Sequence, residues 1–278
     1  MEEYKKVVLT GVIFIALVGI GLGIYYFFIY KKSQKPLSFP EVIEEQPSPV
    51  SLGKPIREEE KMARELAGLD LDNSDDMVRK LAKELSSYPQ LAVWLRNEDL
   101  LRKFTAVVDN IANGLSPRPH IEFLAPQGDF QVIEKDGLFY VNPVSFDRYN
   151  LVADVFASLD SEGCVKLYGQ LKPLVQEAYR DLGYPTQDFQ ETLFKAIIEL
   201  LKTPVIEGEI LLEEKVVTYM MVAPRLENLS PAQKHLLRMG PENVRKIQAK
   251  LREMALALGI PESQLPQSVV YYPDNRKY

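Results

Sequence analysis

Cysteine and histidine are almost absent from this sequence, and so are the motifs of familiar enzymes. The 278 residues include one cysteine, Cys164, and two histidines, His120 and His235. A single cysteine cannot form a disulfide within the chain, and a zinc site built from cysteine and histidine has too few ligands. No G-x-S-x-G, P-loop, H-E-x-x-H or C-x-x-C motif occurs. We therefore expect no catalytic residue, no metal and no cofactor, and a fold that is stabilised by packing.

These three rare side chains are explained better by structure than by chemistry. Cys164 fits a small core residue, and the alternative is a thiol that reacts or pairs between molecules. His120 follows Pro119 in a predicted loop, and His235 lies in a predicted short helix. A lone histidine in either place is more often structural than catalytic.

An excess of positive charge is also missing. The net charge is −6, whereas affinity for nucleic acid depends on many lysine and arginine contacts to phosphates. Nucleic acid is therefore not an expected partner, and any basic surface must be local. The hydrophobic fraction of 46% is enough for one medium-sized domain with a core.

The longest apolar run lies near the amino terminus. Residues 7–30 read VVLTGVIFIALVGIGLGIYYFFIY and contain no charged residue, and the run exceeds the roughly 20 residues that a helix needs to cross a bilayer. Lysines flank both ends, and the run ends in bulky aromatic residues instead of the small residues that precede a signal-peptide cleavage site. We predict an uncleaved transmembrane helix over residues 7–30, after a short tail over residues 1–6.

The flanking charges do not decide which way this helix is oriented. Two lysines and the amino terminus precede the run and three lysines follow it closely, so the positive-inside rule gives no preference. Gly19 and Gly23 form one pair of small residues four positions apart, which allows two such helices to approach closely. The pair is compatible with a weak homodimer, but the general abundance of glycine in membrane helices is the favoured explanation.

Prolines set the next boundary. Residues 31–57 are rich in proline, which excludes a helix and favours a semi-extended linker, with a disordered joint as the alternative. Residues 58–260 then form the predicted folded domain, and residues 261–278 form a C-terminal tail. As alternatives to a loose tail, the run VVYYPDNRKY can add an edge strand or bind a partner.

The domain is predicted to be mainly α, with a small β element in an α+β fold. Asp136-Gly137 between alternating apolar residues predicts a β-hairpin over residues 130–142. Residues 209–224 are rich enough in β-branched and aromatic residues for one or two strands. Helical periodicity fills most of the rest, with one helix expected over residues 146–159, another from Cys164 to Gly183 that kinks or divides at Pro173, and a third capped by Thr186.

Four aspartates between residues 70 and 76 suggest calcium, but their spacing does not fit. With Asp70 as the first position of an EF-hand loop, Asp75 occupies the place of the required glycine, and Leu81 replaces the bidentate glutamate. Ser74 as an N-cap, with acids in the first turn of a helix, explains the cluster instead.

The segment capped by Asn97 predicts an amphipathic helix. Its apolar residues fall on one face that we expect to be core: Leu100, Leu101, Phe104, Val107, Val108 and Ile111. Arg102, Ala106 and Asp109 project from the opposite face. Arg102 and Asp109 are therefore candidates for contact with a partner, and a solvated face is the alternative.

The run LLRMGPENVRKIQAKLRE, residues 236–253, places a Gly-Pro break between two helices. Ser230, Pro231 and Gln233 predict the first helix through a capping box, Gly240 ends it, and Pro241 begins the second. The basic residues near and along the second helix are expected on its surface as a candidate interaction face: Arg238, Arg245, Lys246, Lys250 and Arg252. A structural corner with a solvated basic face is favoured over a face for an acidic partner or lipid headgroups, and a helix-turn-helix reader of DNA is disfavoured.

Four runs in order, LDNSDD, EDLLRKFTAVVDNIA, QEAYRDLGYP and LLRMGPENVRKIQAKLRE, lie behind one predicted membrane anchor. Because of these four runs and the predicted anchor, the chain resembles an uncharacterised family of bacterial envelope proteins, catalogued as domain of unknown function 3014. The resemblance covers about residues 65–256. The resemblance implies a Gram-negative inner-membrane protein with a periplasmic domain. It implies no catalytic residue.

Together these features predict a membrane-anchored envelope protein whose domain is a non-catalytic interaction or scaffolding module. Its expected partner is an unknown envelope protein or a cell-wall polymer. One alternative is a peptidoglycan hydrolase that uses paired carboxylates from among Asp109, Glu177 and Glu191. A second alternative is a cytoplasmic-facing protein that binds nucleic acid or acidic lipid through its basic helix.

Overall fold

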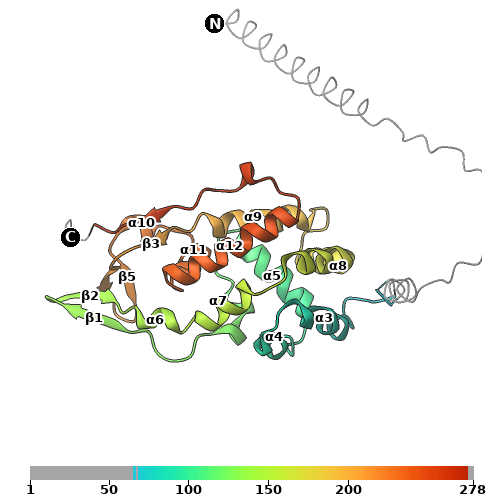
Figure 1. The fold of residues 1–278 in the computed structure, drawn as a ribbon, viewed down its shortest axis with the longest axis horizontal. Coiled ribbons are helices and arrows are strands. Elements are labelled where there is room, and N and C mark those ends of the chain that lie inside the picture. The colour runs from blue at the N-terminus through green and yellow to red at the C-terminus, as the bar shows by residue number, and fades with distance from the viewer. Residues whose placement is uncertain (1–64, 67, 275–278) are drawn as a thin grey trace, which may run out of the picture. The chain divides into compact units, whose positions relative to one another are not determined.

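Helices make up most of the described chain (Figure 1). The computed structural model describes residues 65, 66 and 68–274. In chain order, the α-helices after residue 68 are α3 (Asp75–Ala82), α4 (Pro89–Trp94), α5 (Leu100–Ala112), α6 (Val144–Asp147), α7 (Asn150–Ala157), α8 (Ser161–Asp181), α9 (Phe189–Leu201), α10 (Pro224–Glu227), α11 (Pro231–Leu237) and α12 (Pro241–Ala257). Short 3-10 helices cover Lys83–Leu85, Arg118–His120, Glu122–Leu124 and Glu262–Gln264. The predicted mainly helical class is confirmed.

The strands form two small sheets. β1 (Val132–Lys135), β2 (Leu138–Val141), β4 (Leu211–Glu214) and β5 (Tyr219–Met221) pair in that order as an antiparallel sheet. β3 (Val205–Ile206) and β6 (Val270–Tyr271) form a parallel pair. The β1–β2 hairpin projects at the end of the domain away from α3, α4 and α8 (Figure 1).

The predicted hairpin turn is confirmed at Asp136-Gly137. Both residues have positive φ, 52° for Asp136 and 76° for Gly137, as a two-residue turn that follows the twist of the strands requires. The second predicted β region is also present and supplies two strands, β4 and β5.

The apolar faces of the helices form two adjoining clusters. One cluster joins α3, α5, α8 and α9, and at its centre the rings of Tyr179 and Phe189 meet edge to face with centroids 5.3 Å apart. The other joins α7, α9, α11, α12 and β3 around Leu201 and Val244. Leu193 of α9 packs against both, so α9 connects the two halves of the helical body.

A third apolar cluster lies beneath the antiparallel sheet. Leu212 of β4, Leu226 of α10 and Leu237 of α11 are buried there. The sheet is therefore attached to the helical body through the short helices that precede α12.

Several predicted helix boundaries need correction. Asp188, and not Thr186, caps α9, because the Asp188 carboxylate accepts a 2.9 Å hydrogen bond from the Gln190 N–H. Asp99, and not Asn97, immediately precedes α5. The helix expected over residues 146–159 is divided into α6 and α7, and Pro173 lies inside α8 without dividing it.

The inward face of α5 also differs from the prediction. Ala106 is buried and Phe104 is partly exposed, the reverse of what the apolar stripe indicated. The reason is that α5 packs between α8 and α9, so its buried arc is rotated toward Thr105 and Ala106. Phe104 still places its ring 5.7 Å from that of Phe189.

The acidic cluster before α3 stabilises turns, but Ser74 does not act as predicted. Ser74 occupies the N-cap position, yet its hydroxyl donates to the Leu71 carbonyl at 2.8 Å and accepts no bond from the helix. The Asp75 carboxylate instead accepts from the backbone N–H groups of Asp99 and Leu100, at 2.8 and 2.9 Å. An acid in the first turn of α3 thus caps the start of α5, 25 residues later in the chain.

Packing continues beyond the predicted domain end at residue 260. Leu265 is buried in the second helical cluster, and β6 pairs with β3 in the register Val205 to Val270. The edge strand, which the sequence allowed as an alternative to a loose tail, is therefore present.

The predicted tail, anchor and linker over residues 1–57 lie outside the described residues, as do Gly19 and Gly23. Among the residues that are described, no helix has the length and apolar character needed to span a membrane.

Candidate interaction surfaces

The α11–α12 corner forms as predicted. Ser230 and Gln233 make a capping box, in which the Ser230 hydroxyl accepts from the Gln233 N–H at 3.1 Å and the Gln233 side chain accepts from the Ser230 N–H at 3.2 Å. Pro241 is the first residue of α12, where its missing N–H removes no helical hydrogen bond.

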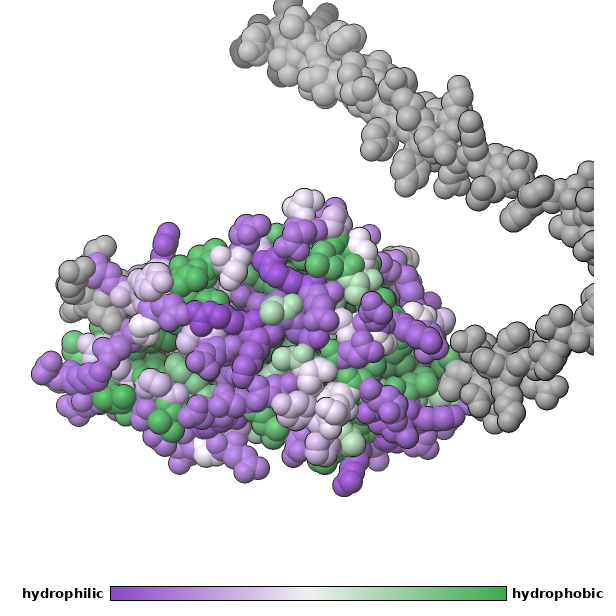
Figure 2. All heavy atoms as spheres, viewed as in Figure 1, coloured by the Kyte–Doolittle hydropathy of each residue, from purple (hydrophilic) through white to green (hydrophobic). Residues whose placement is uncertain are grey.

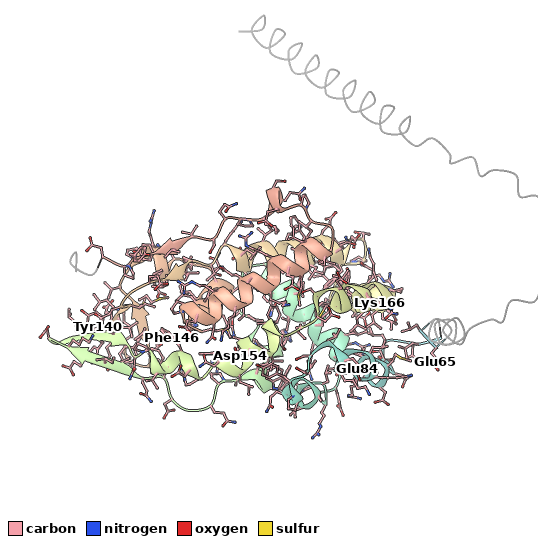
Figure 3. All side chains as sticks on the ribbon, in the orientation of Figure 1. Glu65, Glu84, Tyr140, Phe146, Asp154 and Lys166 are labelled. Atoms are coloured by element: carbon pink, nitrogen blue, oxygen red, sulfur yellow. The ribbon has the colours of Figure 1, made fainter. Side chains whose placement is uncertain are left out.

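Gly240 is required at this corner for two reasons. Its φ of 84° favours glycine, and a Cβ at this position would lie 2.4 Å from Cγ of Phe146. Phe146 belongs to α6, which Figure 3 shows beneath the helical layer that contains α12. The corner therefore brings α12 into close contact with α6.

The buried face of α12 includes polar groups that the apolar pattern did not indicate. Besides Val244, Ile247 and Leu251, it buries Asn243 and Gln248. The Gln248 side-chain amide donates to the carbonyls of Leu200, Leu201 and Thr203, at 3.2, 3.3 and 2.8 Å. These carbonyls lie at the end of α9, so Gln248 satisfies acceptors that a helix end leaves unpaired.

The exposed basic residues of α12 are paired with acids from other elements. Arg245 forms an ion pair with Glu207, which follows β3. Lys246 donates to Asp154 of α7 at 2.7 Å, and this hydrogen bond raises the pKa of the Lys246 ammonium. Figure 3 labels Asp154 on α7, and Figure 2 shows a mainly hydrophilic surface over α12.

Two predicted surface residues are mostly covered. Lys250 is 9% exposed, and its ammonium donates to the Leu159 carbonyl at 2.8 Å and contacts Glu253 at 2.7 Å. Arg252 pairs with Glu262 at 2.9 Å and donates to the Pro266 carbonyl. The expectation that both side chains lie on the open surface is wrong, because the α7–α8 connection and the C-terminal segment cover this side of α12.

Arg238 lies apart from these pairs, at the end of α11, and is exposed. His235 precedes it by one turn. Burial, followed by the nearby charges of Arg238 and Arg118, lowers the pKa of the His235 imidazole. His235 is therefore neutral near pH 7, as a structural histidine would be.

The second predicted face, on α5, also has partners within the chain. Arg102 contacts Asp72 at 2.6 Å, Asp99 at 3.5 Å and Asp181 at 3.6 Å, and the hydrogen bond to Asp72 is the main cause that raises its pKa. Asp109 accepts from the Tyr184 hydroxyl at 3.3 Å. Arg102 therefore holds α5 against the segment that precedes it and against the end of α8. Asp109 holds α5 against the segment that follows α8.

The three carboxylates considered for hydrolysis belong to different helices. Asp109 lies on α5, Glu177 on α8 and Glu191 on α9. Glu191 is exposed in the first turn of its helix, whereas Asp109 is engaged by Tyr184 and Asn113. In residues 65–66 and 68–274, no group of three His, Cys, Asp or Glu side chains is arranged to hold a metal ion.

Cys164 lies in the first turn of α8 and is half-buried. Burial, with a contribution from Asp160, raises the pKa of its thiol to about 11. Since the thiolate is the reactive form, Cys164 is mostly unreactive at neutral pH, which favours the core-residue interpretation.

Sequence reasoning missed the most exposed apolar side chains, at the turn between β4 and β5. Val216 and Val217 are 101% and 92% exposed, and the turn is closed by a 2.8 Å hydrogen bond from the Lys215 N–H to the Thr218 carbonyl. Turn centres favour Gly, Asn, Asp or Ser. The signal is a pair of β-branched residues between two strands with no turn residue beside them, and β-branched residues are typical of strands instead of turns.

The strand register places this turn beside the polar hairpin turn. β2 and β4 pair Tyr140 with Leu211 and Phe139 with Leu212. The Asp136-Gly137 turn before β2 and the Val216-Val217 turn after β4 therefore lie at the same edge of the sheet. One edge presents both a polar turn and an apolar turn, and we call Lys215–Thr218 the β4–β5 tip.

Comparison with known proteins identifies one family. The family model described as protein of unknown function (DUF3014) matches residues 100–255, more than half of the chain. No curated protein and no solved structure matches the chain.

Proposed function

Because the chain belongs to the DUF3014 family, whose function is unknown, we propose that it is a membrane-anchored envelope protein with a non-catalytic interaction or scaffolding domain. In this proposal residues 7–30 span the bacterial inner membrane once, residues 31–57 form a linker, and the domain lies in the periplasm. The apolar, charge-free run at 7–30 supports the anchor. The resemblance to an envelope family supports the location.

The β4–β5 tip is the observation that carries this proposal. Burying a valine side chain stabilises a complex by roughly 1.5 to 3 kcal/mol, and Val216 and Val217 obtain none of this within the described domain. By contrast, a partner that binds Arg245 or Lys246 of α12 must displace Glu207 or Asp154. The tip therefore offers the larger gain on binding.

The charges near the tip favour a protein partner over a lipid surface. Glu213 and Glu214 end β4 immediately before the tip, and Lys215 already forms an ion pair with Glu213. Anionic lipid headgroups attract basic segments and would repel these carboxylates. An apolar hollow on another envelope protein accommodates two valines without this repulsion.

The tip can be tested by placing a photo-crosslinking residue at position 217 of the full chain in intact cells. We expect a discrete adduct with the mass of a second protein, and we expect Val216→Ser to reduce its yield. The same crosslinker at Lys166, an exposed polar position on α8 at the other end of the domain from the sheet (Figure 3), serves as the control. Adducts with lipid alone, or equal adducts at both positions, would contradict the proposal.

Topology requires a separate measurement. With Cys164 replaced by serine and a single cysteine at Ser51 in the linker, a membrane-impermeant maleimide is applied to intact cells whose outer membrane has been made permeable. Labelling before lysis is expected for a periplasmic domain. Labelling only after lysis would place the domain in the cytoplasm and revive acidic lipid or nucleic acid as ligands of the basic helix.

A further inference from the structure

The short helix α4, Pro89–Trp94, consists mainly of apolar residues, yet none of its residues is buried. Trp94, the single tryptophan of the chain, is partly exposed, and Val93 is 45% exposed. Within the part of the chain that the structure describes, no side chain of α4 joins any of the three apolar clusters. Tryptophan is highly buried on average, so the position of Trp94 outside these clusters is unusual.

Polar contacts, and not apolar packing, fix the position of α4. Before the helix, the hydroxyl oxygens of Ser86 and Ser158 lie 2.6 Å apart, which connects this segment to the residue after α7. After the helix, the Arg79 guanidinium of α3 donates to the carbonyls of Leu95 and Asn97, at 2.8 and 2.9 Å. The domain therefore holds the apolar residues of α4 in one place, which reduces the entropy lost when another surface covers them.

The helix α4 lies near the point where the chain enters the domain. Glu65, among the first described residues, contacts Lys80 of α3 at 3.5 Å, and α3 also holds α4. Figure 3 labels Glu65 and Glu84 toward this end of the domain and Tyr140 at the opposite end. Residues 31–64 separate Glu65 from the predicted membrane span and reach at most roughly 110 Å when fully extended. A tether keeps the bilayer at a high effective concentration, so a weak contact is enough to hold the domain against it.

The side chains at α4 are those that are enriched where proteins meet a bilayer. Tyr88, which is 38% exposed, precedes the helix and Trp94 ends it, and both residue types are enriched at the level of the headgroups. The nearest exposed charged residues on either side of α4 are two of each sign: Lys83, Glu84, Arg96 and Glu98. Unlike the acidic residues before the β4–β5 tip, this balanced set does not repel anionic lipid. A lipid surface therefore fits α4 better than it fits the tip.

We propose that α4 contacts the bilayer that holds the chain's own anchor, with Tyr88, Val93 and Trp94 in the headgroup region. The apolar face of a helix bound in this way lies roughly 5 to 10 Å into the boundary between headgroups and acyl chains. The inference rests on the anchor proposed above and deepens it. With α4 against the bilayer, the β4–β5 tip at the other end of the domain is free to contact a protein partner (Figure 1).

The single tryptophan allows a direct test with the full chain. The chain is reconstituted into phosphatidylcholine vesicles in which part of the lipid is brominated on the acyl chains near the headgroup. Bromine quenches tryptophan fluorescence only at close range, and both leaflets carry it, so the orientation of the chain in the vesicle does not matter. At the depth of an interfacial helix, we expect Trp94 emission to fall about twofold relative to vesicles without bromine.

A relocated tryptophan tests whether this contact belongs to α4. Trp94→Phe with Val217→Trp moves the only tryptophan to the β4–β5 tip, where we expect no quenching by brominated lipid. Vesicles that also contain phosphatidylglycerol test the role of charge. Because the charges beside α4 are balanced, this anionic lipid should leave the quenching of Trp94 unchanged.

A second pair of variants tests the apolar contact itself. Tyr88→Ser with Val93→Ser keeps Trp94 and should reduce its quenching by at least about half, because less apolar surface is covered by lipid. Val269→Ser with Tyr272→Ser is the matched control. It removes the same two kinds of side chain from the C-terminal segment, where they are 55% and 71% exposed, and should leave the quenching unchanged.

Flotation of the vesicles in a density gradient measures the anchor separately. If the chain floats with the vesicles, three results would overturn the contact at α4 while the anchor stands. They are no quenching of Trp94, equal quenching of a tryptophan at position 217, and an equal loss of quenching in the Val269 and Tyr272 variant. A chain that does not float would overturn the anchor and the contact together. Failure of crosslinking at position 217 would affect neither measurement.

Discussion

The surface of α12 and the β4–β5 tip differ in how much of their chemistry is used within the chain. Along α12, Arg245, Lys246, Lys250 and Arg252 each contact an acid of the same molecule. At the tip, Val216 and Val217 are fully exposed. The fold therefore pairs the basic side chains of α12 with acids of the same chain, whereas it leaves the two valines of the tip uncovered.

This difference shows why charge in a sequence is a weak guide to a binding surface. A basic run on a helix is attractive to a partner only if the fold leaves it unpaired, and pairing depends on which acids the tertiary structure brings near. An exposed apolar pair at a turn is different, because it can gain free energy only by being covered.

The largest expected effect concerns the corner that positions α12. Gly240→Ala combines an unfavourable φ of 84° with a Cβ 2.4 Å from the Phe146 ring, and should lower the free energy of unfolding by about 3 kcal/mol. Gly183→Ala is the matched control, since its φ is 104° but nothing lies within 4 Å of the added Cβ. It should cost about 1 kcal/mol. If urea denaturation shows that the two variants lose similar free energy of unfolding, the Phe146 ring moves away from the added Cβ at little cost.

The next largest effect compares thiols in the two regions. With Val217→Cys, the chain has one cysteine at the tip and Cys164 in α8, whose pKa is raised to about 11 by burial. A maleimide at neutral pH should label position 217 about 100-fold faster, because far less of Cys164 is thiolate. Peptide mass spectrometry over time gives both rates in one sample. The rates should converge in denaturant, and convergence already in buffer would contradict the raised pKa of the half-buried Cys164 thiol.

A smaller effect separates two lysines of the same helix. Lys250→Met leaves the Leu159 carbonyl without its donor and should lower the free energy of unfolding by about 2 kcal/mol. Lys246→Met removes an exposed pair with Asp154 and should cost about 0.5 kcal/mol or less. Chemical denaturation of both variants checks this order. The opposite order would mean that the exposed Lys246–Asp154 pair stabilises the fold more than the buried Lys250 does.

The sequence predicted most of the helical body and the β1–β2 hairpin because local signals there agree with tertiary packing. The capping box at Ser230 and Gln233, the Gly240-Pro241 break and the Asp136-Gly137 turn are short-range patterns, and each forms as expected. Family membership was likewise evident from runs of sequence. These features depend on neighbours within a few residues.

What the sequence did not predict depends on contacts between distant segments. Nothing near Asp75 indicates that it caps α5, and nothing near Lys250 indicates that the α7–α8 connection covers it. The unpaired oxygen of Asn243 exists only because three acceptors from different segments occupy its amide nitrogen. A helical-periodicity argument assigns such residues to a face but cannot say what lies opposite that face.

The smallest expected effect on stability belongs to the tip itself. Val216→Ser with Val217→Ser removes apolar side chains that are fully exposed, so no packing is lost and the free energy of unfolding of the full chain should change by less than about 0.5 kcal/mol. Thermal and urea denaturation measure this directly. A loss well above that value would mean that the tip is covered in the full chain by a segment outside residues 65–274 or by a second copy. The contrast with α12 would then disappear, because the valines, like the lysines, would already have their partners.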